Sequence, residues 1–463
     1  MIDETSISKE HHKKGKFFPN ISEQSKKDEN MTIQAVVGIN WGDEGKGRMI
    51  DYLAQTANAV VRYQGGNNAG HTVVNDLGEF KLHLIPSGIF NPETLNILGP
   101  GMVINLEALC AEIAELEEAN IDISSLRISD RATVCFPYHQ WEDMWEEERL
   151  GKAAFGSTRQ GIAPAYGDRY IKKTILVGEL LDPENLRTRL SHILKWKNVV
   201  AEGVYGKKNA IDLEEMLAWA EKWTAKIKPY ICDTTAILEE KASKGENILF
   251  EAQLGALRDI YYGIYPMTTS SPTIASYAPV GGGLFNHKVE ETLGVMKAFS
   301  TCVGAGPFVT ELHGEEAEKR RKLANEYGAT TGRPRRIGHF DAVASKYGCM
   351  VQGATSVAIT KLDSLSGWGD LEICTHYEID GEKIDTFPLN HIQDNAKPVC
   401  ITMQGWDEDI SGCRSFNELP KPAQEYALKI EELVNVPIEY ISVGPEREAL
   451  IIMDNKTPIA CAS

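Results

Sequence analysis

The sequence lacks several features that define common functional classes. No apolar run among its 463 residues approaches the length of a membrane span. Its nine cysteines stand singly with no CxxC pair, which argues against a metal or redox motif and favours reduced thiols. Acidic residues outnumber basic ones, 66 to 48, for a net charge of −18. This balance argues against a nucleic-acid partner or an anionic membrane surface.

Residues 1–30 differ in composition from the rest of the chain. They are rich in Lys, Glu, Ser and Asn, with Phe17 and Phe18 as the only large apolar neighbours. Such a segment buries too little surface to offset its ordering entropy. We therefore predict a disordered extension over 1–30 and one catalytic domain over 31–463. The segment also lacks the layout of a signal peptide, so we expect a cytoplasmic protein.

Strand and helix patterns alternate from residue 32 onward. Apolar, largely β-branched runs predict strands at 33–39, 59–63, 247–251 and 356–360. Helical spacing predicts helices beginning at Lys46, over 104–119 and within 211–243. This alternation predicts an α/β fold with a central, mostly parallel sheet covered by helices.

A glycine-rich loop, Gly42-Asp43-Glu44-Gly45-Lys46-Gly47, lies between a predicted strand and a predicted helix. Its glycines let backbone N–H groups approach an anion, while the helix N-terminus and Lys46 add positive charge. The GK[ST] ending of the Walker loop is missing, so we predict a phosphate site of another lineage. The alternative is a tight turn in which Asp43 caps the helix.

A second glycine-rich loop, Gly65-Gly66-Asn67-Asn68-Ala69-Gly70-His71-Thr72, follows the strand predicted at 59–63. So polar a run favours a ligand site over a packing role. His71 is suited to act as a general acid or as an electrostatic partner of a transferring phosphoryl group. The alternative is a histidine satisfied within a turn. The presence of Asp43 favours the catalytic interpretation.

Two further segments suit recognition of a base and of a small dicarboxylate. Thr360-Lys361-Leu362-Asp363 closes a predicted strand. A carboxylate there can accept hydrogen bonds from N1–H and the exocyclic amine of guanine, and the lysine stem can lie along the purine face. The segment 328–336 holds three arginines and two threonines, a set that binds carboxylates well. The alternatives are a strand-end Lys/Asp pair and a solvated basic loop.

Together these segments resemble the adenylosuccinate synthetase family. Seven motifs stand in the family's order between about Ile33 and Met453, including Gly-Ile-x-Pro-Ala-Tyr, Val-Gly-Ala-Gly-Pro-Phe and Ser-x-Gly-Pro. The resemblance implies a homodimer with a large, mostly parallel sheet, related to P-loop proteins. It also implies Mg²⁺-dependent ligation of IMP and L-aspartate to adenylosuccinate, with GTP as co-substrate and 6-phosphoryl-IMP as intermediate, at the first committed step of AMP biosynthesis.

The family's roles carry over to matching positions. Asp43 corresponds to the base that removes the N1 proton of IMP, His71 to the residue that stabilises the transferring phosphoryl group, and Asp43 with Gly70 to the Mg²⁺ ligands. Positions matching GTP contacts are Gly42, Glu44, Gly45, Lys46, Gly47, Arg48, Gly70, Thr72, Arg335, Lys361, Leu362, Asp363, Ser442, Val443 and Gly444. Positions matching IMP contacts are Asp43, Lys46, Asn68, Ala69, Thr158, Lys172, Leu254, Thr269 and Arg333. Positions matching aspartate contacts are Ala329, Thr330, Thr331, Arg333 and Arg335.

The acceptor-nucleotide side departs from the family pattern. Leu254 replaces a glutamine that contacts the IMP base, Arg258 replaces an apolar residue near the base, and Lys172 replaces an arginine that reaches the partner's IMP phosphate. The segment 157–161 is also shuffled, and Asn40 replaces a glutamine. A paralogue that joins aspartate to another purine monophosphate, such as dGMP, is therefore the alternative. Less favoured are a non-catalytic nucleotide-binding homologue and a GTP-hydrolysing switch protein.

Overall fold

The computed structural model describes residues 32–327 and 334–453. The extension predicted over 1–30 lies outside these residues, as does the tip of the arginine-rich loop, 328–333. No helix within the described ranges is long and apolar enough to cross a membrane.

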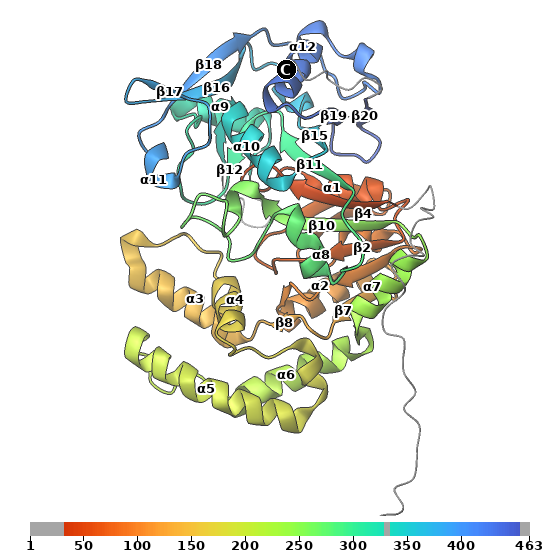
Figure 1. Cartoon of the computed structure of the whole chain (residues 1–463), viewed down its shortest axis with the longest axis vertical. Coiled ribbons are helices and arrows are strands. Elements are labelled where there is room, and N and C mark those ends of the chain that lie inside the picture. Colours follow the sequence, from red (N-terminus) through yellow and green to blue (C-terminus); the bar gives the residue numbers. More distant parts are fainter. Residues whose placement is uncertain (1–31, 328–333, 454–463) are drawn as a thin grey trace, which may run out of the picture.

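A ten-stranded sheet forms the centre of the molecule, in the order β20-β19-β15-β11-β1-β10-β2-β5-β7-β9 (Figure 1). Every neighbouring pair is parallel except β19 and β20. The predicted α/β fold with a mostly parallel sheet is therefore confirmed. The strands are β1 (Ile33–Gly38), β2 (Ala59–Arg62), β5 (Leu95–Leu98), β7 (Leu126–Ser129), β9 (Ile231–Cys232), β10 (Ile248–Gly255), β11 (Glu291–Lys297), β15 (Ser356–Thr360), β19 (Ile438–Ser442) and β20 (Leu450–Ile452).

The four strands expected from the sequence all belong to this sheet. They read as apolar runs because helices cover both faces of a parallel sheet, so both sides of each strand are buried. β10 differs from its expected range, since it continues past Glu251 to Gly255. That extension carries Gln253 and Leu254 to the strand end.

The expected helices are present with shifts of a few residues. α1 (Lys46–Leu53) follows the phosphate loop, and α2 (Leu106–Glu118) begins after Asn105, whose side chain accepts the N–H of Ala108. The helix-rich stretch contains α6 (Leu213–Ile227) and α7 (Thr234–Ser243). The other helices are α3 (Pro137–Leu150), α4 (Ile162–Tyr170), α5 (Pro183–Tyr205), α8 (Ala278–Gly282), α9 (Gly314–Leu323), α10 (Ala342–Gln352), α11 (Asn390–Gln393) and α12 (Lys421–Val434).

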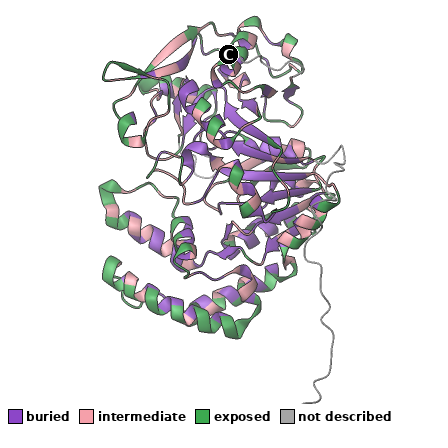
Figure 2. Ribbon diagram, in the orientation of Figure 1, coloured by how far each residue is buried: buried purple, intermediate pink, exposed green. Residues whose placement is uncertain are grey.

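Two peripheral regions flank the sheet. Figure 1 shows α3, α4, α5 and α6 at one end, and a small sheet with α9, α10 and α12 at the other. Figure 2 shows buried residues along the central strands and exposed ones on the outer helices. The minor strands are β3 (His71–Asn75) with β4 (Gly78–Leu82), β6 (Val103–Ile104) with β8 (Thr133–Val134), β12 (Ser300–Cys302) with β13 (Arg336–Gly338), and β14 (Phe340–Asp341), β16 (Leu371–Ile379), β17 (Glu382–Ile384) and β18 (Lys397–Met403).

One edge of the central sheet gathers the predicted site segments. β19, β15, β11, β1, β10 and β2 are consecutive neighbours, and all five pairings are parallel, so their carboxyl ends lie together. Segments predicted to bind ligands follow directly after most of these strands. This edge is where ligands bind in parallel α/β sheets.

Candidate active site

The phosphate loop is held in shape by its own buried glutamate. The Glu44 carboxylate accepts hydrogen bonds from the N–H groups of Asn40 (3.1 Å) and Gly42 (2.8 Å) and pairs with Lys46 Nζ at 2.6 Å. It fits there because a side chain at Gly38 or Gly255 would lie 2.5 Å from its oxygens. The Glu44 carboxylate therefore fixes the shape of the loop. Because this carboxylate is already bonded within the loop, a ligand would be bound by the backbone of the loop.

Asp43 does not cap the helix that follows it. α1 is capped by Gly45, with a φ of 92° and no side-chain hydrogen bond. Asp43 has a φ of 65°, and its carboxylate instead forms an ion pair with Nε of Arg335. The capping alternative is thus wrong, because the left-handed turn directs Asp43 away from the helix start. The Asp43 side chain is 34% exposed, so a ligand can reach it.

His71 begins β3 and packs against the start of α1. A side chain at Gly47 would lie 2.7 Å from its imidazole, so glycine is required there. His71 Nε2 lies 2.8 Å from Ser87 Oγ and 3.5 Å from Glu251 Oε1. Burial, aided by Arg62, lowers the pKa of His71 well below its ordinary value. The imidazole is therefore neutral at neutral pH, with one N–H and one lone pair. It is satisfied by a strand-to-helix contact, not within a turn.

The Lys/Asp segment predicted to read guanine closes β15. Lys361 has a φ of 63°, and its Nζ donates to the carbonyl of Ala324 at 2.9 Å. Burial raises the pKa of Asp363 above its ordinary value, against the opposing effect of Lys361. On the neighbouring strand, Ser442 ends β19 and Val443 and Gly444 follow it, and all three are buried. The segments after β15 and β19 therefore lie side by side at the carboxyl ends of these two strands.

Arg48 ties the phosphate-loop helix to this second segment. Its guanidinium donates to Ser442 Oγ, to the carbonyl of Glu446 (3.1 Å) and to that of Ala449 (2.6 Å). Burial lowers the pKa of Arg48 to about 10. One turn later, Asp51 accepts from Arg447 Nε (2.6 Å) and Nη2 (2.8 Å). The Arg48 side chain thus supports the segment after β19, which is predicted to bind guanine, instead of facing the phosphate loop.

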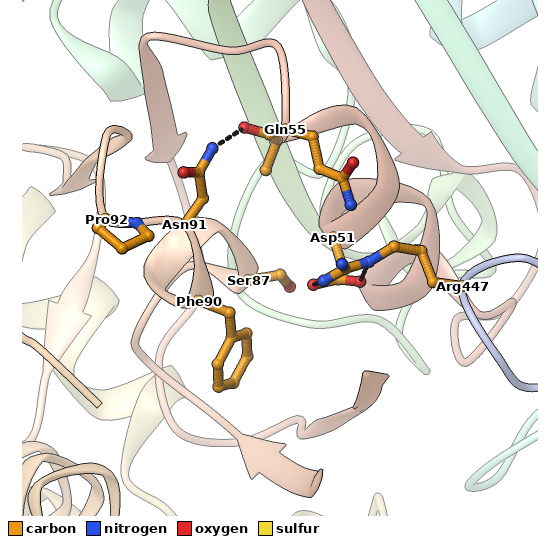
Figure 3. A pocket seen from close by; sticks show the side chains of 8 residues that line it. Asp51, Gln55, Ser87, Phe90, Asn91, Pro92 and Arg447 are labelled. Atoms are coloured by element: carbon orange, nitrogen blue, oxygen red, sulfur yellow. Dashed lines mark hydrogen bonds and ion pairs between the residues drawn. The ribbon is translucent and has the colours of Figure 1, made fainter. Parts of the chain in front are cut away.

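A cavity of about 340 Å³ lies behind this connection. Figure 3 shows the Asp51–Arg447 pair at its edge, with Gln55 from the turn after α1 and Asn91 from the segment after β4 also lining it. Ser87 also lines it, and the same hydroxyl contacts His71. The cavity therefore borders the serine that supports His71.

On the acceptor side, Gln253 does not stand in for the family glutamine replaced by Leu254. Gln253 Nε2 donates to the carbonyls of Gly66 (2.7 Å) and Ala69 (3.0 Å), and its Oε1 accepts from the Gly66 N–H at 3.1 Å. These bonds hold the second glycine loop from behind. Leu254 has a φ of 63° and packs against Gly42, beside Asp43. An apolar side chain thus lies next to the expected base position.

Arg258 fastens two other walls of the acceptor side. Its guanidinium donates to the carbonyls of Met267, Val303 (2.5 Å) and Ala305 (3.2 Å), and its own carbonyl accepts from Thr269 N–H at 2.9 Å. The side chain is buried, and burial lowers its pKa. Arg258 therefore braces the loops instead of presenting its charge at the surface.

The other positions predicted to contact IMP make fewer contacts with the loops described above. Thr158 and Lys172 are exposed, and within the described ranges neither side chain hydrogen-bonds to the phosphate loop. Oδ1 of Asn68 is buried and has no partner among the described residues, so this amide is available to a ligand. The predicted aspartate contacts Ala329, Thr330, Thr331 and Arg333 lie outside the described residues.

The structure adds functional residues that the sequence analysis missed. Glu251 supports His71 through Ser87, while Lys297 and Glu326 contact one another at 2.9 Å beside Arg335 and Lys361. The available signal was a charged residue at the end of an apolar strand, as at Glu251 and Lys297. Glu326 had no local signal except its place just before the arginine-rich loop.

Comparisons with known proteins identify the family. The family model described as adenylosuccinate synthetase matches residues 35–451. The chain belongs to the adenylosuccinate synthetase family. Adenylosuccinate synthetase 2 of Pseudoalteromonas translucida is 52% identical over 418 residues, which cover 90% of this chain and 99% of that protein.

Two solved structures are also similar. Fully ligated adenylosuccinate synthetase from Plasmodium falciparum has a TM-score of 0.84 at 32% identity, covering 91% of this chain and 100% of that one. Succinoaminodeoxyadenylate synthetase of cyanophage S-2L, bound to dGMP and dATP, has a TM-score of 0.59 at 18% identity, covering 91% and 95%. The second likeness shows the fold alone. Membership of the family supports the predicted GTP-dependent ligase of purine biosynthesis and favours IMP over the dGMP alternative.

Proposed function

We propose that the chain joins IMP and L-aspartate at the carboxyl edge of the sheet, with Asp43 as the base. The observation that carries this proposal is the arrangement of Asp43, Lys46 and His71. Asp43 comes from the loop after β1 and His71 begins β3, and both lie beside the first turn of α1, where Lys46 stands. A carboxylate, an ammonium group and an imidazole around one helix N-terminus suit phosphoryl transfer.

The proposed reaction has two steps. Asp43 takes the N1 proton of the hypoxanthine ring, so that O6 attacks the γ-phosphorus of GTP and the bond to the β-phosphate oxygen breaks. His71 and Lys46 stabilise the charge on the transferring group. The aspartate amine then attacks C6. The C6–O6 bond breaks, O6 leaves as part of the phosphate, and the attacking nitrogen loses a proton. Phosphorylation is needed because an amide-like oxygen is a poor leaving group.

The donor set near Asp43 fits Mg²⁺. Within the described residues no three His, Cys, Asp or Glu side chains gather as a metal cage. Magnesium is usually held by one or two protein oxygens together with substrate phosphates, and the partly exposed Asp43 carboxylate and the exposed Gly70 supply such oxygens. We propose these two as its protein ligands. When bound, the ion neutralises charge on the phosphates.

An acceptor assay tests the proposed function. Purified protein with GTP, Mg²⁺ and L-aspartate is expected to release phosphate when IMP is offered and to release none when dGMP is offered. Because apolar Leu254 offers no hydrogen bond to a purine edge, the assay compares the two acceptors directly. Phosphate release and adenylosuccinate formation are measured together.

The same assay separates the other candidate activities. Omitting aspartate is the control, because a GTP-hydrolysing switch protein releases phosphate without it. Turnover with dGMP and none with IMP contradicts the proposed acceptor, and no turnover with either acceptor contradicts the ligase.

We also propose a homodimer of single-domain subunits, spanning 31–463, in the cytoplasm. An exposed aromatic patch supports the dimer: Tyr170, Tyr261 and Tyr265 are 66%, 68% and 65% exposed, and Tyr170 contacts Tyr261. Aromatic residues are enriched at subunit interfaces, and exposed apolar patches commonly mark them. Lys172 stands two residues from Tyr170, so this face is the one that brings it near a partner's acceptor site.

The dimer is tested by mass and by one surface substitution. Sedimentation is expected to give twice the chain mass of 51.2 kDa, and Tyr261→Glu is expected to shift the protein toward the monomer and raise the KM for IMP. Leu77→Glu is the control, since Leu77 is 59% exposed in the turn between β3 and β4, on elements other than those that carry the three tyrosines. A monomeric wild type contradicts the proposal.

A further inference from the structure

One buried carboxylate, that of Glu326, lies between the guanine side and the aspartate side of the site. Glu326 stands after α9 and just before the arginine-rich loop, and its side chain is 0% exposed. Both carboxylate oxygens accept hydrogen bonds from Lys297 Nζ at 2.9 Å. Lys297 ends β11 and is itself buried. This pair fastens Glu326 to the edge of the central sheet.

Two further cations share the same carboxylate. Arg335 Nη1 lies 2.9 Å from Glu326 Oε2, and Lys361 Nζ lies 3.7 Å from Oε1. Burial raises the pKa of Glu326, but Lys297, Lys361 and Arg335 outweigh burial and lower it to about 2. The group is therefore ionised throughout the physiological range. Neutralising it leaves three cations close together with no shared counter-ion.

The backbone around Glu326 makes the same two connections. The Glu326 carbonyl accepts the N–H of Arg335 at 3.0 Å, and Tyr327 pairs with Pro334 across the base of the loop. On the other side, the carbonyl of Ala324 accepts from Lys361 Nζ at 2.9 Å. A short segment thus touches both the lysine that lies beside the guanine position and the stem of the loop expected to hold aspartate.

The two arms of Glu326 lead to different substrates. Lys361 follows β15, the neighbour of β11, and belongs to the segment with Asp363. Arg335 reaches from Glu326 to the catalytic Asp43 carboxylate. One fixed carboxylate pairs with both Lys361 and Arg335. A ligand that attracts one of these two cations therefore changes how strongly Glu326 binds the other.

We propose that Glu326 is a positioning residue that couples the guanine site to the aspartate site. The proposal rests on the proposed function, which assigns GTP and aspartate to these two sides. Glu326 does not touch either substrate. It acts by holding Lys361 and Arg335 in place, with Lys297 as the anchor in the sheet.

Three variants test this coupling by steady-state kinetics. Glu326→Gln keeps the shape but removes the charge, and Glu326→Asp keeps the charge on a shorter stem. Glu316→Gln is the matched control, because Glu316 pairs with Arg320 within α9 and faces solvent. Glu326→Gln is expected to raise the KM for GTP and the KM for aspartate by about tenfold or more, because breaking a buried charged pair leaves its partners uncompensated.

The pattern of constants distinguishes positioning from general damage. The KM for IMP is expected to stay within about twofold of wild type, because Glu326 reaches the acceptor side only indirectly, through Arg335 and Asp43. Glu326→Asp is expected to raise the KM for GTP and the KM for aspartate by smaller factors. If Glu326→Gln does not fold, the Glu326→Asp variant is used for the test instead. A rise in only one of the two constants, or an equal rise in all three, overturns the proposal.

A binding measurement keeps this test separate from that of the proposed function. GDP binding by calorimetry needs no turnover, so it reports on the guanine side even if the wild type fails to ligate IMP and aspartate. GDP is expected to bind Glu326→Gln about tenfold more weakly than wild type. An unchanged GDP affinity overturns the coupling, whereas absent aspartate-dependent turnover in the wild type overturns the proposed function alone.

Discussion

Asp43→Asn is expected to lower aspartate-dependent turnover by about a thousandfold or more while GTP and IMP still bind. The amide cannot take the N1 proton of IMP, and it also lacks the negative charge that now pairs with Arg335. The change is isosteric, and the Asp43 side chain is partly exposed, so the fold should be kept. Stopped assays of phosphate and adenylosuccinate, together with calorimetry for GDP and IMP, measure the two effects.

Asp76→Asn provides the control for the loss of one negative charge nearby. Asp76 is exposed in the turn between β3 and β4. If Asp43→Asn turns over at the wild-type rate, Asp43 is not the base. The non-catalytic alternative is also decided here, because a protein that only binds nucleotide has no aspartate-dependent turnover for the substitution to remove.

Asp363→Asn is expected to raise the KM for GTP by about a hundredfold and to make XTP the better phosphoryl donor. The carboxylate of Asp363 offers two acceptors, which match N1–H and the exocyclic amine of guanine. Asparagine offers one acceptor and one donor, which match N1–H and the 2-oxo group of xanthine. The measurement is kcat/KM for GTP and XTP with IMP and aspartate saturating.

The design of this test uses a neighbouring carboxylate. Asp370→Asn is the control, because Asp370 is exposed and seven residues further along the chain. The KM values for IMP and aspartate should change little in Asp363→Asn, since Asp363 reads only the base. If GTP and XTP are affected equally, Asp363 does not read guanine, and the interpretation of Lys361–Asp363 as a simple strand-end pair is favoured.

The difference between the Asp43 and Asp363 variants separates chemistry from recognition. A lost proton acceptor lowers kcat, because it acts only as the reaction proceeds. A lost base contact raises the KM for one substrate, because it acts on binding. Observing the two patterns in the two variants supports the division of the site between the phosphate loop and the end of β15.

Features that depend on neighbours in the chain could be predicted from the amino-acid order alone. Apolar runs predicted β1, β2 and β15 within a residue or so, since the burial of a parallel strand shows in its own composition. Glycine spacing predicted the phosphate loop, because positive φ values at Gly42 and Gly45 are a local requirement. The ordered motifs were enough to indicate the family and its reaction.

The way in which distant side chains share their charges depends on the assembled fold. No local pattern shows that Gln253 turns back to the second glycine loop, or that Arg258 braces the wall at Val303. Nor does it show that Glu326 holds Lys297, Arg335 and Lys361 together. These contacts depend on which strands are neighbours and on which buried charges must find partners. Both are settled only when the sheet is assembled, because an unpaired charge in the interior is too costly to remain.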